Sequence, residues 1–270
     1  MSLSPKTLRR NLESLARCAS VEESLKLNKT LDDFFYGTSL SHESCIKEQG
    51  VGVYAGLPLD ALLTPYLDYY RILQSLPHGS TLTDLGSGYS RGTFLSKYLE
   101  LNTWIGIEFV RQRVEVAKKQ YLALFGTEAD EIIHKNLLHA TIPNSEAYFL
   151  YFPRGVVLDT ILRKISLLNQ DKLLYIIESH GDVIPYINKL SCLKLREKFQ
   201  TSTPRHNNYI HKFQFLKNSK AVSFEENPFE WMLFNKESSL CFKIQLFHKV
   251  LNDYVLWHVP VDMCSMEEVD

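Results

Sequence analysis

Two glycines and a carboxylate in the first half of the chain are arranged as a binding site for an adenosine. Gly86, Ser87 and Gly88 follow an apolar run at 81–85 that predicts a strand, and they precede a stretch that predicts a helix. Glycine has no Cβ, so a ligand can approach its backbone closely, and it adopts positive φ at little cost. Glu108 ends a second predicted strand, where a carboxylate can accept hydrogen bonds from both ribose hydroxyls. This order of strand, glycine turn, helix, strand and carboxylate is typical of α/β proteins that bind adenosine-containing ligands.

The charge beside the turn distinguishes two candidate ligands, a dinucleotide such as NAD and S-adenosylmethionine. A dinucleotide turn has glycines at relative positions one, three and six, whereas here Arg91 is the sixth residue and Gly92 the seventh. Asp84 places a carboxylate next to the turn, which would repel a pyrophosphate but attract a ligand that carries an ammonium and a sulfonium. The residues therefore favour S-adenosylmethionine. The alternatives are a dinucleotide and a strand-to-helix turn that binds nothing.

From Asp84 to Glu108 the chain resembles the class I, seven-strand S-adenosylmethionine-dependent methyltransferases, and the resemblance covers about residues 50–180. It implies that the turn after Asp84 lies along the methionine and ribose of the donor, and that Glu108 binds the ribose hydroxyls. The family commonly has a polar residue near the adenine amino group after the third strand. This implies that role for Asn136, with Leu137 behind it.

A narrower resemblance lies upstream of the turn. The segment 53–59 resembles the pre-helix arrangement of the non-SET histone-lysine methyltransferases and their bacterial relatives, which implies that Tyr54 lies against the methionine end of the donor. The chain departs from those enzymes at Leu57, where they have an acidic residue, and at 151–153, where they have paired asparagines. Ser90 also replaces the third glycine of many relatives. The resemblance therefore bears on the donor site more than on the substrate.

Candidate catalytic residues follow the fourth and fifth predicted strands, because ligands of open parallel sheets bind beyond the carboxyl ends of the strands. Tyr151 follows the fourth strand and can donate or accept a hydrogen bond, or it can simply close the core. His180 follows the fifth strand and can act as a general base near neutral pH, with Glu178 orienting it or a substrate cation. The alternative is that the polar residues here only cap the next helix. Methyl transfer depends mainly on alignment, so these roles are less specific than those at the turn.

The elements that position these residues predict an α/β fold. It is a Rossmann-like seven-stranded sheet, mostly parallel with an antiparallel C-terminal hairpin, with helices on both faces and a helical N-terminal cap. Strands are predicted at 81–85, 103–108, 131–136, 147–152 and 172–178, and helices at 92–101, 110–124, 156–168 and 183–198. The cap comprises predicted helices at 5–17, 20–30 and 60–76, and two β-rich runs at 240–250 and 254–261 predict the hairpin. We expect a helical extension at 1–50, the methyltransferase domain at 51–265 with an insertion at about 200–235, and an acidic tail at 266–270.

The composition predicts a cytoplasmic protein. The chain has 270 residues and is 45% hydrophobic, which is enough for one good core. The five cysteines are scattered without a C-x-x-C pair, and the histidines lack ligand spacing, so neither a disulfide framework nor a metal site is expected. No apolar run reaches the length of a membrane span, and the N-terminus lacks the apolar core of a secretory signal.

Charge is uneven along the chain, although its net value is only −1. The formal charge is −2 for residues 1–150, +7 for 151–220 and −6 for 221–270. Basic residues alternate with aromatic ones in the middle block, a pattern that can bind nucleic acid through phosphate contacts and base stacking. The alternative is that the aromatic residues belong to the core and the charges are solvated.

The C-terminal pentapeptide Met266–Asp270 is identical to the end of the cytosolic Hsp90 chaperones. The resemblance implies a handle for tetratricopeptide-repeat proteins, whose basic clamps capture a terminal carboxylate. The alternative is an acidic tail without a partner.

These observations predict an S-adenosylmethionine-dependent methyltransferase. Its methyl acceptor is unknown, and a protein amine is slightly favoured over RNA or a small molecule. The first alternative is a non-catalytic interaction protein on a methyltransferase fold, and the second is a nucleotide-dependent oxidoreductase.

Overall fold

The computed structural model describes residues 4–18, 20–37, 40, 63–153, 155–168, 171–178, 183–202, 209–216, 249–250 and 253–254. The chain divides into two compact units, Met1–Ser223 and Phe224–Asp270. The domain boundaries predicted from the sequence, after residues 50 and 265, lie outside the described residues and stay predictions.

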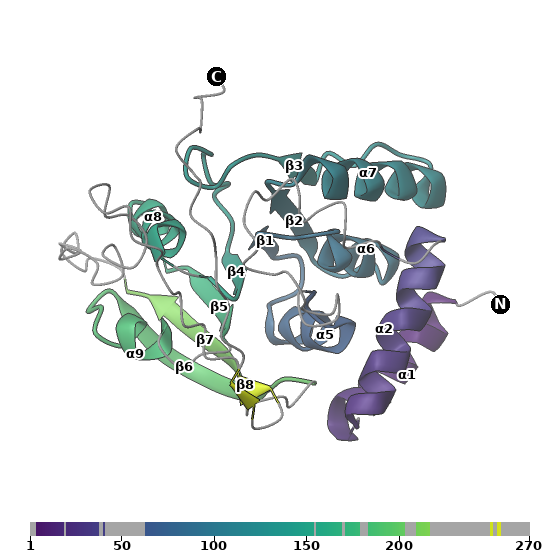
Figure 1. Cartoon of the computed structure of the whole chain (residues 1–270), viewed down its shortest axis with the longest axis horizontal. Coiled ribbons are helices and arrows are strands. Elements are labelled where there is room, and N and C mark those ends of the chain that lie inside the picture. Colours follow the sequence, from purple (N-terminus) through teal and green to yellow (C-terminus); the bar gives the residue numbers. More distant parts are fainter. Residues whose placement is uncertain are drawn as a thin grey trace. The chain divides into compact units, whose positions relative to one another are not determined.

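A seven-stranded sheet in the order β3-β2-β1-β4-β5-β7-β6 forms the centre of the first unit (Figure 1). Its strands are β1 (Thr81–Leu85), β2 (Thr103–Glu108), β3 (Ile132–His134), β4 (Ala147–Tyr151), β5 (Leu173–Ile177), β6 (Leu193–Gln200) and β7 (Tyr209–Phe215). The first five strands are parallel, whereas β7 is antiparallel to both β5 and β6. This is the Rossmann-like, mostly parallel sheet with an antiparallel closing pair that the sequence predicted.

Helices alternate with the parallel strands and cover both faces of the sheet. They are α1 (Pro5–Cys18), α2 (Val21–Tyr36), α5 (Tyr66–Ser75), α6 (Arg91–Tyr98), α7 (Arg111–Phe125), α8 (Gly155–Ser166) and α9 (Val183–Ile187). Figure 1 shows α5 and α6 on one side of the sheet and α8 on the other. The N-terminal cap packs onto this layer, with α2 against α5 and α7 and α1 against α5. None of the described helices is long and apolar enough to cross a membrane.

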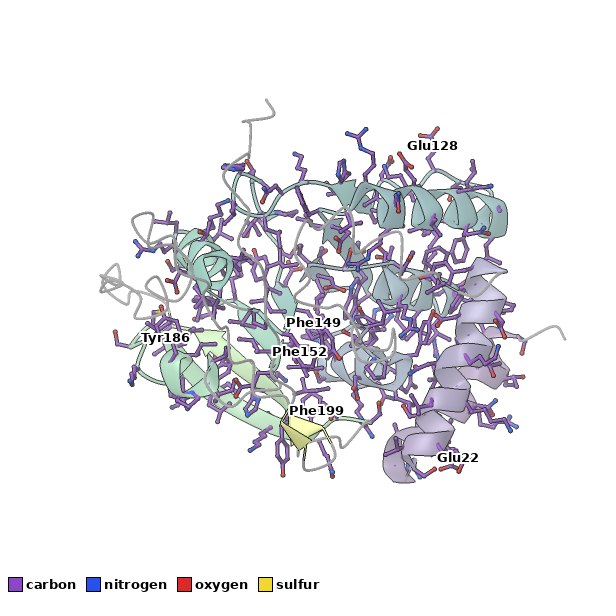
Figure 2. The ribbon with its side chains drawn as sticks, viewed as in Figure 1. Glu22, Glu128, Phe149, Phe152, Tyr186 and Phe199 are labelled. Atoms are coloured by element: carbon purple, nitrogen blue, oxygen red, sulfur yellow. The ribbon has the colours of Figure 1, made fainter. Side chains whose placement is uncertain are left out.

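The core lies where the central strands meet these helices. Tyr148, Phe149, Tyr175 and Ile176 are fully buried, as expected for parallel strands that are covered on both faces. Figure 2 shows Phe149 in the interior, whereas Glu22 of α2 and Glu128 after α7 lie at the periphery. The buried central strands fix the edge at which β1, β2 and β4 end, and the candidate site lies at that edge.

The antiparallel strands of the main sheet lie earlier in the chain than predicted. We expected them at 240–250 and 254–261, but the main sheet ends with β7 and β6. In the second unit, β8 (Lys249–Val250) ends the first of these runs and β9 (Asp253–Tyr254) overlaps the start of the second, and these two described strands pair with each other. The described part of the predicted hairpin does form an antiparallel pair, whereas the antiparallel strands described in the main sheet are β7 and β6, and β7 lies within the stretch at 200–235 that we expected to be an insertion.

The predicted helix at 183–198 is also wrong beyond Ile187. The chain turns after α9 and enters β6, which pairs with β7 from Leu193 onward. Five successive residues of β6, 194–198, are exposed, so its charged side chains do not alternate with apolar ones. Lys, Arg and Glu are good helix formers, and on an edge strand they also prevent pairing with other chains. Local propensity therefore predicted a helix where pairing with β7 makes a strand.

Candidate cofactor site at the glycine turn

The turn after β1 is held in a left-handed backbone conformation at three positions. The φ angles are 102° at Gly86, 58° at Gly88 and 61° at Ser90. The amides of Gly86 and Ser87 both donate to the carbonyl of Ile107 in β2, at 2.9 and 3.0 Å. The turn is therefore fastened to the neighbouring strand, and the glycines occupy the positions whose conformation needs them.

Glu108 at the end of β2 binds the same turn. Its Oε2 accepts a hydrogen bond from the amide of Gly88 at 2.7 Å, and its Oε1 accepts one from the amide of Val110 at 2.8 Å. Burial raises the pKa of this carboxyl, and Arg113, whose Nη1 is 3.9 Å from Oε1, opposes that shift. Glu108, the residue predicted to bind the ribose, is thus joined to the predicted glycine turn by a hydrogen bond.

Asp84 lies at the other side of the turn and is only 1% exposed. Its Oδ2 accepts hydrogen bonds from the Tyr69 hydroxyl at 3.2 Å and from Trp104 Nε1 at 3.3 Å. Its Oδ1 has no hydrogen-bond partner among the described residues. Burial, with a smaller contribution from the nearby Glu108, raises the pKa of Asp84 to about 7, and the hydrogen bonds from Trp104 and Tyr69 oppose this shift. A cationic group of a ligand would supply the missing partner and favour the ionised form.

Gly92, the third glycine of the pattern, is needed for packing and not for the conformation of the turn. A Cβ on Gly92 would lie 2.4 Å from Cε2 of the Trp104 ring. Gly92 therefore lets α6 approach the indole that donates to Asp84. The glycine spacing that argued against a dinucleotide in the sequence therefore reflects this packing contact.

The predicted adenine residues lie in a fixed loop after β3. Oδ1 of Asn136 accepts a hydrogen bond from the amide of Leu138 at 3.0 Å, so this oxygen already shapes the loop. Lys164 of α8 donates to the carbonyls of Leu137, Leu138 and Ala140 at 2.9, 2.8 and 2.8 Å. The side chains of Asn136 and Lys164 therefore both fix the conformation of this loop. Contact of Asn136 and Leu137 with an adenine stays a prediction.

Phe109 is a site candidate that the sequence reasoning missed. It follows Glu108 directly and is 52% exposed, although it is a large apolar residue. Nε2 of His134 lies 2.9 Å from its carbonyl oxygen, which ties the end of β2 to the end of β3. The sequence did contain a signal for it, because Phe109 is an aromatic residue directly after the carboxylate that ends the second strand.

Tyr151 and Phe152 form a stacked pair at the carboxyl end of β4. Their ring centroids are 4.0 Å apart with an interplanar angle of 21°. Both side chains are partly buried and pack against the core, and Figure 2 shows Phe152 near Phe149. Phe152 has a φ of 49°, a strained value for a residue with a Cβ, and its amide donates to Ile177 at 2.8 Å. Strain of this kind is often found at functional sites.

The predicted acid–base pair after β5 is described only in part. Oε2 of Glu178 accepts a hydrogen bond from the amide of Val183 at 2.8 Å, so Glu178 caps the start of α9. His180 and Tyr54 lie outside the described residues. Their roles stay predictions, and the structural role observed for Glu178 is the capping role we had considered for its neighbours.

No group of three or more His, Cys, Asp or Glu side chains in the described part of the chain could hold a metal ion. For an organic ligand, the described residues present the carboxyls of Asp84 and Glu108, a turn with left-handed backbone angles, and the aromatic side chains of Phe109, Tyr151 and Phe152. Every residue that was predicted to bind the methyl donor, and that the structure describes, lies in β1, in the turn after β1, in β2 or in the loop after β3.

Comparison with known proteins finds only distant similarities, all to solved structures. No family model and no curated protein matches the chain. TrmN from Thermus thermophilus is 13% identical with a TM-score of 0.45, over 56% of this chain and 49% of that chain, so this chain spans about half its length. A SAM dependent methyltransferase from Aquifex aeolicus is 14% identical with a TM-score of 0.44, over 66% of this chain and 100% of its own. Phosphoethanolamine N-methyltransferase 1 from Haemonchus contortus, in complex with phosphoethanolamine and S-adenosylhomocysteine, is 12% identical with a TM-score of 0.45, over 76% and 52%. Similarity at this level does not identify a function, which has to be argued from the site.

Proposed function

We propose that this protein is an S-adenosylmethionine-dependent methyltransferase whose donor binds at the glycine turn. The observation that supports this most is Asp84, a buried carboxyl with an acceptor oxygen that no described residue satisfies. It lies at the end of β1, beside the left-handed turn that Glu108 closes. Buried carboxyl oxygens are normally hydrogen-bonded, so an open one beside such a turn favours a ligand with a positive group.

The chemistry of this donor fits the residues better than that of a dinucleotide. S-adenosylmethionine carries an ammonium and a sulfonium, whereas a pyrophosphate would bring two negative charges close to Asp84 and Glu108. The donor supplies an activated methyl group. The residues that we propose to hold it are Tyr54, Asp84, Gly86, Ser87, Gly88, Glu108, Phe109, Asn136 and Leu137.

The protein has to align the acceptor with this methyl group and keep water away from it. Such alignment can lower a barrier by roughly 7 to 11 kcal/mol in the most favourable cases. We propose that the stacked rings of Tyr151 and Phe152 border the acceptor channel. Two aromatic faces suit a cationic side chain, so a protein amine is the first acceptor to test, with RNA and small molecules as the other candidates. Any acid–base role of His180 and Glu178 is part of the same proposal.

A calorimetric titration with S-adenosylhomocysteine, and in parallel with NADH, tests the proposal. Wild-type protein should bind the former and not the latter. Asp84→Asn should weaken binding by about ten- to a hundredfold, as expected for loss of one hydrogen bond to a charged group. Binding of NADH alone would support the oxidoreductase, and binding of neither would contradict the proposal.

Asp68 provides a matched control for this substitution. It is also buried, with a pKa raised by burial to about 6 and with one oxygen that has no described partner. Its other oxygen binds Arg71 and the amide of Ser202, away from the turn. Asp68→Asn should therefore change the affinity less than about twofold. Donor binding without transfer of labelled methyl groups to any component of a cell extract would favour the non-catalytic alternative.

A further inference from the structure

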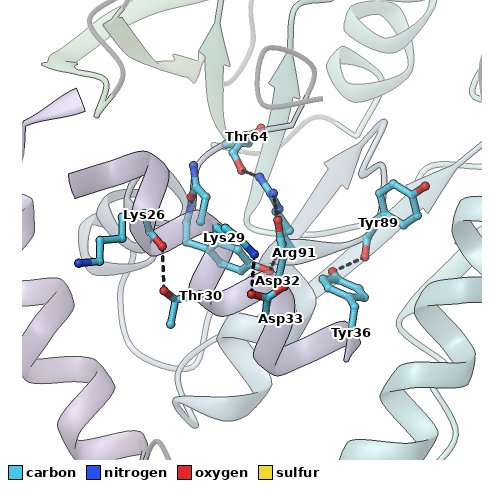
Figure 3. A network of polar contacts seen from close by, with 11 residues as sticks. Lys26, Lys29, Thr30, Asp32, Asp33, Tyr36, Thr64, Tyr89 and Arg91 are labelled. Carbon is cyan, nitrogen blue, oxygen red and sulfur yellow. Dashed lines mark hydrogen bonds and ion pairs between the residues drawn. The ribbon is translucent and has the colours of Figure 1, made fainter. Parts of the chain in front are cut away.

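A buried ion pair joins the N-terminal cap to the residue that follows the glycine turn. Arg91, the first residue of α6, is 1% exposed, and its Nε donates to Oδ1 of Asp32 in α2 at 2.9 Å. Its Nη2 pairs with the second oxygen of the same carboxylate, and its Nη1 donates to the carbonyl of Thr64 at 3.2 Å. Figure 3 shows these side chains meeting between α2 and the start of α6. A guanidinium that binds both oxygens of a carboxylate has little rotational freedom.

A second contact reaches the turn itself. The hydroxyl of Tyr36, the last residue of α2, donates to the carbonyl of Tyr89 at 2.7 Å (Figure 3). Tyr36 is fully buried, so this carbonyl has no access to water if the hydroxyl is removed. The helix α2 therefore holds both neighbours of Ser90, Tyr89 through its carbonyl and Arg91 through its side chain.

Ser90 is the residue that needs such support. Its φ of 61° is unfavourable for a residue with a Cβ, and the family that this chain resembles often has glycine there. Strained residues of this kind persist only where the surrounding structure fixes them. The side chain of Ser90 contributes one contact, from its Oγ to Oγ of Ser87 at 3.1 Å. The two contacts from α2 fix the backbone on either side.

We propose that α2 is part of the donor site, because Asp32 and Tyr36 hold the turn in its binding conformation before the donor arrives. This role rests on the proposed function, since it assigns α2 to that same site. Preorganisation of this kind raises affinity by removing the cost of ordering the site during binding. Asp32 and Tyr36 are positioning residues, which act through Arg91 and Tyr89.

The test compares two substitutions that each remove one hydroxyl from a buried tyrosine. Tyr36→Phe removes the hydrogen bond to the turn. Tyr70→Phe removes the hydrogen bonds to Glu13 of α1 at 3.3 Å and from Gln74 of α5 at 2.9 Å, neither of which involves the turn. Tyr36→Phe should weaken S-adenosylhomocysteine binding about tenfold and speed hydrogen exchange of the amides at 86–91 without ligand. Tyr70→Phe should leave both within about twofold, although both variants lose some thermal stability.

A second substitution distinguishes a loss of positioning of the turn from a general loss of stability. Glycine adopts left-handed backbone angles without strain. Ser90→Gly should therefore restore most of the affinity that Tyr36→Phe loses. Equal affinity and equal exchange at 86–91 in wild type and Tyr36→Phe would overturn the role of α2 and leave the proposed function intact. Wild-type protein that binds no S-adenosylhomocysteine would overturn the proposed function, and with it the role of α2 in donor binding.

Discussion

Asp84 shows what a single residue adds once its surroundings are known. Its position near the end of β1 made it the residue that favoured S-adenosylmethionine over a dinucleotide, on the assumption of a full negative charge. Burial raises its pKa to about 7, so near neutral pH the carboxyl is ionised only in part. The sequence predicts where the carboxyl lies, whereas its charge depends on its burial, which the hydrogen bonds from Trp104 and Tyr69 oppose.

The burial of Asp84 predicts an effect on stability. Its pKa in the folded protein lies above the ordinary value, so the folded state binds the proton more tightly than the unfolded state does. This contribution is favourable in acid and is lost as the pH rises through about 7. Asp84→Asn should therefore raise the free energy of unfolding at about pH 8, by up to about 4 kcal/mol, and change it much less at about pH 4.

Denaturant unfolding of both proteins at the two pH values measures this difference. A stabilised variant that no longer binds the donor would show that the wild type tolerates a buried carboxyl for the sake of its ligand. An equal effect of the substitution at both pH values would contradict the raised pKa.

The elements were predictable where burial gives them a pattern. The strands β1, β2, β4 and β5 are largely buried on both faces, so their apolar runs and the turns between them predicted them closely. The edge strand β6 has no such pattern, and its exposed charges suggested a helix. The contact between α2 and α6 could not be predicted, because Asp32 and Arg91 lie far apart in sequence and Asp32 belongs to no motif.

The pair between α2 and α6 predicts a contrast between two adjacent aspartates. Asp32→Asn leaves the buried guanidinium of Arg91 without its counter-charge and should destabilise the protein by about 3 to 5 kcal/mol. Asp33→Asn breaks only an exposed pair with Lys29, at 2.9 Å on the same helix, and should cost less than about 1 kcal/mol. Chemical denaturation of the two variants checks this, and similar losses for both would show that the buried pair is not important for stability.

At the scale of the whole molecule, the structure describes the donor half of the site better than the acceptor half. The glycine turn, Glu108 and the loop after β3 were predicted from short-range patterns, and the structure brings them together. The exposure of Phe109 and the position of Glu178 as a helix cap could not be predicted from such patterns, because both depend on how the chain folds around them. The basic block at 151–220 contains β6 and β7, and Phe213 and Phe215 of β7 are buried in the core, as our alternative to nucleic-acid binding supposed. The peptide Met266–Asp270 lies outside the described residues, and its capture by a tetratricopeptide-repeat protein stays a prediction.

The most direct test of the central claim is the proton balance of donor binding. If the ammonium of S-adenosylhomocysteine pairs with Asp84, binding near pH 7 should release about half a proton, since a carboxyl at its pKa is half protonated. Calorimetry in buffers of different ionisation enthalpy measures this release, and the affinity should rise with pH between about 6 and 8. Asp84→Asn should abolish both effects. Tight binding that releases no proton and does not change with pH would contradict the assignment of Asp84 to the donor.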